Sequence, residues 1–330
     1  MLWFKKKFAE KFPAIYGVIR GIKERQKRIF RQSLLQGRVD TPPDDIPESL
    51  RSEFTFDGKI PVLKWYFDDR VAKPVQNTKK IYKQTLTALE NKTFEYYDND
   101  MLSFYDAFRD YSLEGKVILI LGLAGCNCEA MALWQGADRV YVVDYNPPIC
   151  EHEKITVLSH AELSQLMDAG LRFDCAFSFS SFEHDGLGRY GDPVSPNADL
   201  AVMQYVKALL KTDGWLFLGV PTGRDCLVWN AHRIYGELRL PLLLDGWLCL
   251  DSYFYRGIEI FDDQLGAHNQ PLLILKNSLA IDNKIIEERI DYARTLICEG
   301  KTTTKDGKIL EKVLLMQLDL LNRRAGRATS

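Results

Sequence analysis

The sequence lacks the features that mark membrane-spanning, disulfide-rich and zinc-binding proteins. No apolar run in its 330 residues approaches the roughly 18 residues that a membrane-spanning helix needs. The charged residues near the N-terminus are not followed by an apolar stretch, so we expect no signal peptide. The seven cysteines are odd in number and scattered, and none is spaced with a histidine as in a zinc site. We therefore expect a cytoplasmic protein with reduced thiols and without a metal site.

Positive charge is concentrated in one part of the chain. The net charge is −2, yet residues 1–38 contain eleven Lys and Arg against two Glu. Phe4, Phe8 and Phe12 recur every fourth residue beside these charges, which predicts a basic amphipathic helical extension. Such a helix suits an anionic membrane surface, where the protein would be peripheral. The alternative is a helix that packs on its own domain or on a partner subunit. No aromatic stacking motif accompanies the charges, so we expect no nucleic-acid partner.

Residues 116–144 contain the strongest structural signal in the chain. Val117–Leu121 is an uninterrupted apolar run, typical of a strand buried on both faces of a parallel sheet. A glycine-containing turn follows at 122–125, then a run of helix formers at 127–135, and then a second strand that ends at Asp144. In the nucleotide-binding half of a doubly wound fold, such a turn approaches the ligand and such an acid binds ribose. We therefore predict a cofactor that contains a nucleoside.

The alternation of strands and helices continues towards the C-terminus. Further strands are predicted at 155–158, 173–180, 215–220, 257–261 and 271–275, and helices at 161–169, at 198–210 and twice within 280–324, around a turn at 305–307. The last two strands are joined without a helix, which favours an antiparallel hairpin at the sheet edge. The aromatic-rich residues 96–111 predict a helix over the mouth of the sheet.

These elements divide the chain into four predicted parts. They are a basic extension (1–38), a linker and accessory segment (39–94), a doubly wound domain (95–277) and C-terminal helices (278–330). The predicted fold class is α/β, with a mostly parallel, Rossmann-like sheet of seven strands whose last strand is antiparallel. Helical extensions are predicted at both ends.

Unusual polar residues follow the fourth and fifth predicted strands, at the edge where open α/β sheets bind ligands. The first group is Glu183, His184, Asp185, Arg189 and Tyr190, and the second is His232 and Arg233. The alternatives are structural: the first group would satisfy backbone groups of a buried loop, and the second would belong to a helix.

Three glycines that lie among the residues of the first group match a phosphate-binding pattern. Gly186, Gly188 and Gly191 fit G-x-G-x-x-G literally. However, Asp192-Pro193 follows directly and prevents a helix from starting there. We therefore interpret these glycines as shaping a loop that presents polar side chains to a substrate.

Three stretches also carry a family resemblance. They are EHDGLGRYGDPVSP at 183–196, LLKTDGWLFLGVPTGRD at 209–225, and NAHRIYGELRLP at 230–241. On these stretches, residues from about 95 to 276 resemble an uncharacterised domain-of-unknown-function family that is grouped with class I S-adenosylmethionine-dependent methyltransferases. The resemblance implies the fold and S-adenosylmethionine as the cofactor. It implies no particular reaction, because the activity of that family is unassigned.

The resemblance also implies roles for individual residues. Asp144 would bind ribose, while Gly122, Ala124 and Gly125 would form the cofactor turn, and Ser159 and His160 occupy the region that usually contacts adenine. The methyltransferase pattern has an acid two residues before the turn, which helps hold the amino-acid end of the cofactor. This chain has Ile120 there, and Ala124 and Cys126 replace the second and third glycines of the pattern.

We therefore predict methyl transfer from S-adenosylmethionine to a small polar acceptor, such as a sugar or glycan precursor. The protein must chiefly align donor and acceptor. An acceptor hydroxyl also needs a base, for which His184 is the first candidate and Asp185 the second, with Glu183 beside them. The candidates for binding the acceptor are Arg189, Tyr190, His232 and Arg233, the arginines through a carboxylate or phosphate.

Two other functions compete with this prediction. One is a binding or regulatory domain that kept the fold and lost the chemistry, which the departures at Ile120, Ala124 and Cys126 favour. The other is a nicotinamide or nucleotide-sugar enzyme. The predicted closing hairpin argues against the latter, because the sixth strand of nicotinamide dehydrogenases is normally parallel.

Overall fold

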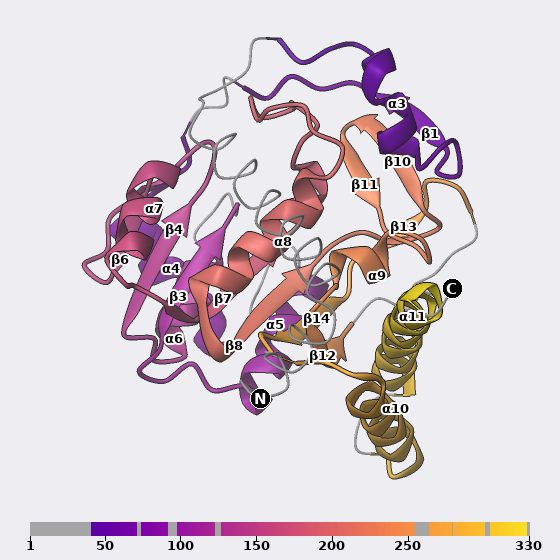
Figure 1. Cartoon of the computed structure of the whole chain (residues 1–330). Helices are drawn as coiled ribbons and strands as arrows, with labels where there is room; N and C mark the ends of the chain where they lie inside the picture. Colours follow the sequence, from indigo (N-terminus) through magenta and orange to yellow (C-terminus); the bar gives the residue numbers. More distant parts are fainter. Residues whose placement is uncertain are drawn as a thin grey trace.

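A seven-stranded sheet forms the centre of the molecule (Figure 1). The computed structural model describes residues 41–70, 74–91, 98–122, 127–254, 264–278, 280–300 and 304–328. The strands of the sheet are β3 (Val117–Leu121), β4 (Arg139–Val143), β6 (Ile155–Leu158), β7 (Phe173–Phe179), β8 (Leu210–Gly219), β12 (Leu248–Tyr253) and β14 (Leu272–Lys276). Their order is β12-β14-β8-β7-β3-β4-β6, and β14 runs antiparallel to both its neighbours. The predicted doubly wound, mostly parallel sheet with an antiparallel last strand is confirmed.

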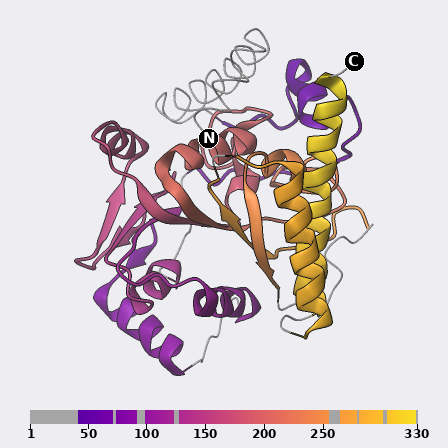
Figure 2. The same cartoon turned by 60° about the horizontal axis from the view of Figure 1, so that its bottom comes forward.

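Helices cover both faces of this sheet (Figure 2). One face packs on α4 (Lys79–Asn91), α5 (Asp98–Asp110) and α6 (Asn127–Trp134). The other packs on α7 (His160–Asp168), α8 (Ala198–Leu209), α9 (Leu240–Leu243), α10 (Asn283–Cys298) and α11 (Thr304–Ala328). Successive side chains of a strand point to opposite faces of the sheet, and helices cover both faces. The side chains of β3 are therefore buried on both faces, which explains why the strand shows no polar alternation.

Aromatic side chains fill the core between α5 and the sheet. Phe104 and Phe108 lie with their ring centroids 5.8 Å and 5.6 Å from that of Phe177, which is fully buried on β7. Burial of each such ring contributes about 1.5–3 kcal/mol. The expectation that this helix lies over the mouth of the sheet is therefore wrong, because its apolar stripe binds to the face of the sheet instead.

Two further expectations are corrected near the C-terminus. The partner of the last strand is β12, which the sequence did not predict, while the predicted strand 257–261 lies outside the described residues. The predicted turn at 305–307 is helical, because α11 already begins at Thr304. The preceding helix ends instead before Gly300, whose positive φ of 64° suits a helix end.

A small second sheet lies beyond the edge of the main one. It has the order β1-β10-β11, formed by β1 (Val62–Trp65), β10 (Cys226–Asn230) and β11 (His232–Ile234), with α3 (Glu48–Thr55) beside it. The alternative interpretation of residues 230–236 as helical is therefore wrong. The side chain of Asn230 fixes the incoming chain, since it accepts from the Phe67 N–H at 2.8 Å and donates to the Phe67 carbonyl at 2.9 Å.

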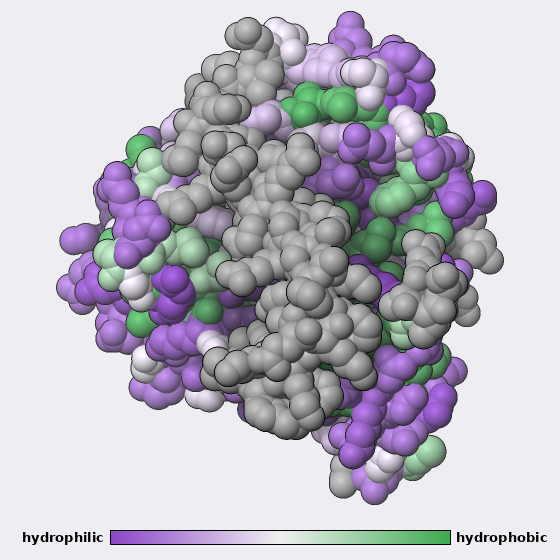
Figure 3. Space-filling model, in the orientation of Figure 1, coloured by the Kyte–Doolittle hydropathy of each residue, from purple (hydrophilic) through white to green (hydrophobic). Residues whose placement is uncertain are grey.

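Five short elements complete the part that positions the site. Two strand pairs are β2 (Gln76–Asn77) with β5 (Ile149–Cys150) and β9 (Thr222–Gly223) with β13 (His268–Asn269), and η1 is a single 3-10 turn (Phe182–His184). The predicted basic extension, residues 1–38, lies outside the described residues. Among the helices of the described ranges, none combines the length and apolar character needed to cross a membrane. On the face in Figure 3 the described side chains are mainly hydrophilic, with hydrophobic ones in small groups.

Candidate functional site

A pocket lies at the carboxyl ends of the strands, where the strand order reverses. The chain leaves β3 towards β4 and β6 on one side, and then returns to β7 and β8 on the other. This reversal is where open α/β sheets bind their ligands. The pocket wall includes Gly122, Asp144, Tyr145, His160, Ser181 and Asp185. It thus brings together three of the predicted cofactor-binding residues and one predicted catalytic residue.

Gly122 is required at the end of β3 for two reasons. Its φ is +65°, a conformation that other residues rarely adopt, and an added Cβ would lie 1.9 Å from the Ser181 hydroxyl oxygen. The backbone after β3 can therefore pass close to the backbone after β7. The other two predicted turn residues, Ala124 and Gly125, lie outside the described residues.

Asp144 lies on the pocket wall at the end of β4. One of its carboxylate oxygens accepts from the Asn146 N–H at 2.7 Å, which fixes the side chain at this edge. The His160 ring lies 5.1 Å from the Tyr145 ring, and burial lowers the pKa of His160 to about 4, so the ring is neutral near pH 7. Both the ribose and the adenine candidates therefore face one pocket.

Ser159 has a different environment from its neighbour. Its hydroxyl accepts from the Glu162 N–H at 3.2 Å, and the Glu162 carboxylate accepts from the Ser159 N–H at 2.8 Å. This is a capping box, which stabilises the start of α7. In this structure Ser159 is a helix cap, and it is not among the residues of the pocket wall.

The pocket is small. Its free volume is about 40 Å³, whereas pockets that enclose drug-sized ligands usually measure roughly 300–1,000 Å³. The residues of the wall suit an adenosine group in kind, because they offer a carboxylate for ribose and neutral rings for a base. An adenosine would nevertheless need side chains of the wall to move. Binding would thus select a more open arrangement of this edge.

Glu129 is a buried acid that the sequence analysis missed. It lies in the first turn of α6, is fully buried, and neither carboxyl oxygen has a hydrogen-bond partner in the part of the chain that the structure describes. Burial raises the pKa of Glu129 to about 8, and the nearby charge of Asp144 adds to this effect. Its place in a run of good helix formers gave no sign of this environment.

We expect the Glu129→Gln variant to resist alkaline pH better than the wild type. Because the folded pKa exceeds the ordinary value of 4.5, the folded state holds a proton that the unfolded state releases, and stability falls as pH rises towards about 8. Between pH 5.5 and 8.5 the unfolding free energy of the variant should fall by on the order of 2 kcal/mol less than that of the wild type. Urea unfolding at pH 5.5, 7 and 8.5 would measure it, with Glu153→Gln, an exposed glutamate, as the control. Parallel profiles for Glu129→Gln and wild type would contradict the assignment.

The loop after β7 is built around Asp192. This buried carboxylate accepts from the N–H groups of Gly186 at 2.7 Å, Gly188 at 3.1 Å and Tyr190 at 3.2 Å. The backbone donors that would bind a phosphate in a true G-x-G-x-x-G loop are therefore directed at a side chain of the loop itself. The glycines shape a loop, in agreement with the interpretation from the sequence.

Arg233 stabilises this loop. It is buried, and its guanidinium donates to the carbonyls of Glu183 at 3.3 Å, Asp185 at 2.6 Å and Pro196 at 3.2 Å. These contacts occupy donors that were predicted to bind an acceptor carboxylate or phosphate. Arg233 therefore holds the loop in shape, and the structure does not bring it to the pocket wall.

A second buried arginine belongs to the same network. Arg239 donates from Nη2 to Asp199 Oδ1 at 2.6 Å and from Nε to Asp199 Oδ2 at 2.9 Å. The Tyr235 hydroxyl donates to the same carboxylate at 3.0 Å, and Asp225 accepts from the N–H groups of Gly236 and Arg239. The stretches that carry the family resemblance thus meet in one buried polar network.

His184 is oriented by the small second sheet. Its Nδ1 lies 2.6 Å from the Ala231 carbonyl oxygen, so Nδ1 carries the proton and donates. Nε2 lies 3.7 Å from a carboxyl oxygen of Glu183. Burial lowers the pKa of His184 to about 3 and raises the pKa of Glu183 to about 8. His184 is therefore a neutral base beside a protonated acid, and neither residue is part of the pocket wall.

Asp185, by contrast, faces the pocket. It is 9% exposed and belongs to the wall together with Asp144. Burial raises its pKa well above the ordinary value, and the neighbouring Asp192 raises it further, while Arg233 lowers it. Of the three predicted catalytic residues, Asp185 is the one that lies on the wall of this pocket.

Three predicted acceptor-binding residues form a cluster outside the pocket. The His184 ring lies 5.5 Å from Tyr190 and 6.4 Å from His232, and the Arg189 guanidinium lies 4.9 Å from the centre of the Tyr190 ring. Trp65, which the sequence analysis overlooked, lies 6.4 Å from His232 and is 59% exposed. The cluster thus offers aromatic faces beside the partly buried Arg189, which is paired with Asp69.

Asp69 connects this cluster to the pocket. Its carboxylate accepts from Arg189 Nε at 2.6 Å, and its carbonyl accepts from Asn146 Nδ2 at 3.5 Å. Asn146 in turn donates its N–H to Asp144. The predicted cofactor side and the predicted acceptor side are therefore adjacent. In the described ranges, no group of three or more His, Cys, Asp or Glu side chains could hold a metal ion.

The comparison with protein families gives one match. Residues 115–271, a little under half of the chain, match DUF268, described as a Caenorhabditis protein of unknown function. This match confirms the predicted resemblance to an uncharacterised family in the central part of the chain. Among curated proteins, none matches this chain.

Solved structures similar to the chain include two bacterial N-methyltransferases. One is the 1,6-didemethyltoxoflavin-N1-methyltransferase of Burkholderia thailandensis, with 18% identity, a TM-score of 0.42, and 73% of this chain and 94% of that chain covered. Another is NodS of Bradyrhizobium japonicum, with 16% identity, a TM-score of 0.40, and 55% and 98% covered. A structure of NodS with S-adenosyl-L-homocysteine has a TM-score of 0.38 at 15% identity, with 61% and 98% covered.

Proposed function

We propose that the protein is an S-adenosylmethionine-dependent methyltransferase that acts on a small polar acceptor. The observation that carries the proposal is the placement of two carboxylates, Asp144 and Asp185, on one pocket at the point where the strand order reverses. The resemblance of the central part to a family grouped with class I methyltransferases supports the choice of cofactor.

Three residues of the pocket have a part in binding the cofactor in this proposal. Asp144 accepts hydrogen bonds from the ribose hydroxyls, Gly122 lets the backbone approach the ligand, and His160 packs against the adenine ring. The cofactor would supply a methyl group bound to a sulfonium, from which a neutral thioether leaves. The protein therefore has to orient the acceptor, exclude water and remove a proton.

The geometry favours Asp185 over His184 as the base. Asp185 lies on the pocket wall, where its ionised carboxylate could accept a proton from the acceptor, whereas His184 does not lie on that wall. His184 donates to the Ala231 carbonyl and faces Glu183, which is the environment of a positioning residue. In this proposal His184 links the loop to the second sheet, and Asp185 accepts the proton of the acceptor.

The acceptor would lie against the cluster of Arg189, Tyr190 and His232. An exposed indole, that of Trp65, suits the apolar face of a sugar ring, and Arg189 suits an anionic group on the acceptor. These features support a sugar or glycan precursor as the acceptor. Attachment to an anionic membrane through residues 1–38 remains a separate prediction.

Two observations favour a second function. The free volume of about 40 Å³, together with the fully buried Ile120 in place of the usual acid, suits a domain that kept the fold and no longer binds the cofactor. Such a domain would act in binding or regulation.

We expect isothermal titration calorimetry to separate the two functions. The full chain should bind S-adenosylmethionine and S-adenosyl-L-homocysteine, and Asp144→Asn should weaken binding by roughly 10- to 100-fold, because hydrogen bonds to a charged acceptor are lost. Asp138→Asn, at the exposed opposite end of β4, is the matched control and should bind as the wild type does. Absence of binding by the folded wild type would favour the second function.

A further inference from the structure

The described part of the chain begins beside the cluster that is proposed to bind the acceptor. Thr41 Oγ1 accepts from Arg70 Nη2 at 3.3 Å, and the Pro42 carbonyl accepts from the Tyr66 hydroxyl at 2.9 Å. Pro42 also lies against the loop after β7, since a Cβ added to Gly188 would lie 3.2 Å from the Cβ of this proline. In Figure 1 this part of the chain, in indigo, crosses the top of the molecule. The residues before Thr41 are therefore joined to the domain at this edge.

Asp69 ties this first stretch to the cluster. Its N–H donates to the Arg189 carbonyl at 2.9 Å, and its carboxylate accepts from Arg189 Nε at 2.6 Å. The next residue, Arg70, donates to Thr41. Arg38, the last cation of the predicted basic extension, precedes Thr41 by three residues, which span at most about 11 Å. A surface that binds the extension as far as Arg38 therefore lies close to the cluster.

The composition of residues 1–38 selects the kind of surface. These residues contain eleven Lys and Arg against two Glu, with Phe4, Phe8 and Phe12 at every fourth position. Cations in such a segment are attracted to anionic headgroups, and the aromatic side chains beside them enter the headgroup layer. A neutral or cationic surface would not attract the segment in this way. The edge around Thr41 therefore lies at an anionic membrane when the segment is bound to one.

Three exposed apolar side chains lie on segments that border the same edge. Trp65 is 59% exposed, Ile149 52% and Val75 37%. The Ile149 N–H donates to the Val75 carbonyl at 2.9 Å, and Asn146, three residues before Ile149, donates to the Asp69 carbonyl at 3.5 Å. Isolated side chains of this kind are common on protein surfaces. An indole and aliphatic side chains at the base of a basic amphipathic segment, however, form the combination that enters a headgroup layer.

The acids next to the cluster are paired with cations. Lys64 Nζ lies 3.1 Å from the Asp45 carboxylate, Arg70 Nε 2.7 Å from that of Asp68, and Arg189 Nε 2.6 Å from that of Asp69. Each pair is close to neutral as a unit, so these carboxylates do not repel anionic headgroups. The edge can therefore approach an anionic membrane.

We propose that this edge of the molecule faces an anionic membrane and that the acceptor is a sugar or glycan precursor carried on a membrane lipid. The choice of acceptor rests on the proposed function, whereas the membrane contact does not. The lipid anchor would keep the acceptor in the bilayer while its sugar reaches the exposed indole of Trp65 and the cluster beside it. Residues 1–38 would hold the protein at the same surface.

Quenching of tryptophan fluorescence by lipid tests the membrane contact. The full chain with Trp3→Phe, which removes the indole of the basic extension, is mixed with vesicles of phosphatidylcholine and about one quarter phosphatidylglycerol. The acyl chains of these lipids are brominated near the headgroup. We expect the fluorescence to fall, and we expect most of this quenching to be lost when Trp65→Phe is added. A folded protein that does not bind the vesicles, or that binds them without quenching of Trp65, overturns the proposal.

A matched pair of variants separates this edge from the rest of the surface. Val75→Ser combined with Ile149→Ser should weaken vesicle binding by about tenfold, because two apolar side chains no longer enter the headgroup layer. Leu315→Ser is the control, since this leucine is 43% exposed on α11 and should have no effect on binding. Equal binding by the control and the double variant would contradict the placement of the membrane at this edge.

Methyl transfer in the same vesicles tests the class of acceptor. A panel of methyl glycosides is compared with the same sugars attached to dioleoylglycerol, at equal concentrations. We expect transfer to the lipid-borne sugars to be at least about tenfold faster, because enzyme and acceptor are concentrated at one surface. The double variant should lose this advantage and keep its rate with methyl glycosides, since neither Val75 nor Ile149 belongs to the pocket wall or the cluster.

The outcomes distinguish the two proposals. Equal rates with both forms of a sugar overturn the choice of a lipid-borne acceptor. If neither form is methylated, the proposed function fails, and the quenching of Trp65 still decides whether this edge contacts the membrane.

Discussion

The Arg239→Met variant is expected to lose about 3–5 kcal/mol of unfolding free energy, because the substitution leaves a buried carboxylate without its principal partner. Arg239 and Asp199 are both nine-tenths or more buried, and two hydrogen bonds of 2.6 Å and 2.9 Å join them. The remaining cation, Arg233, lies 3.8 Å away and cannot replace both bonds. Urea unfolding at pH 7 measures the loss.

Two variants control this experiment. Arg324→Met breaks an ion pair of equal length with Asp245, but the arginine is 46% exposed, so we expect a loss of at most about 1 kcal/mol. The double variant Asp199→Asn, Arg239→Met removes both charges and should lose less than the sum of the single losses. Equal losses for Arg239→Met and Arg324→Met would show that burial of the pair contributes nothing.

The second large effect concerns catalysis. We expect Asp185→Asn to slow methyl transfer by about 10²- to 10⁴-fold, because an amide cannot accept the proton of the acceptor. His184→Asn should slow it less than tenfold, since an asparagine N–H can still donate to the Ala231 carbonyl as Nδ1 of the histidine does. Initial rates with radiolabelled S-adenosylmethionine and a panel of sugar acceptors measure both.

The comparison of these two variants also decides between the two candidate bases. If His184→Asn is the slower enzyme while its cofactor affinity is unchanged, the histidine is the base and the placement of Asp185 on the wall is incidental. Calorimetry on Asp185→Asn completes the test, because a variant that no longer binds the cofactor says nothing about proton transfer. We expect it to bind, since Asp144 is still present.

The sequence predicted the elements whose signal is local. The apolar run at Val117–Leu121 and the acid Asp144 are read from neighbouring residues, and the structure places both as expected. The placement of β10 in a sheet with β1 could not be read in this way, because β1 lies more than 150 residues earlier in the chain. Its pairing is a property of the folded molecule rather than of residues 226–234.

The roles of the polar side chains were harder to predict than their proximity. Arg189, Tyr190 and His232 do gather near His184, as the strand order required. Arg233, however, donates to loop carbonyls. An arginine that binds a ligand and one that holds a loop look the same in a sequence, because only the folded chain decides which acceptors come within reach. Glu129 was missed for the same reason.

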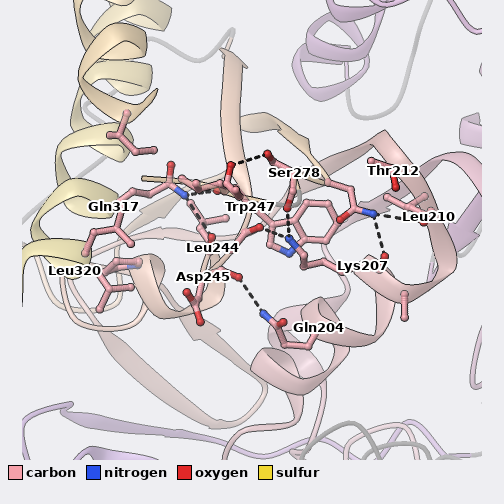
Figure 4. Close-up of a pocket in the computed structure, with 18 residues that line it drawn as sticks. Gln204, Lys207, Leu210, Thr212, Leu244, Asp245, Trp247, Ser278, Gln317 and Leu320 are labelled. Carbon is pink, nitrogen blue, oxygen red and sulfur yellow. Dashed lines mark hydrogen bonds between the residues drawn. The ribbon is translucent and has the colours of Figure 1, made fainter. Parts of the chain in front are cut away.

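Helix α8 has a residue in the wall of two separate spaces. Tyr205 faces the pocket at the carboxyl ends of the strands, and Lys207, two positions later, faces a cavity of about 580 Å³ (Figure 4) whose wall includes Leu210, the first residue of β8. If α8 moves as a rigid body, a molecule that displaces it on entering one space changes the affinity of the other space for its own ligand. Thermodynamic linkage then requires that a ligand in the second space changes the affinity of the first space by the same factor.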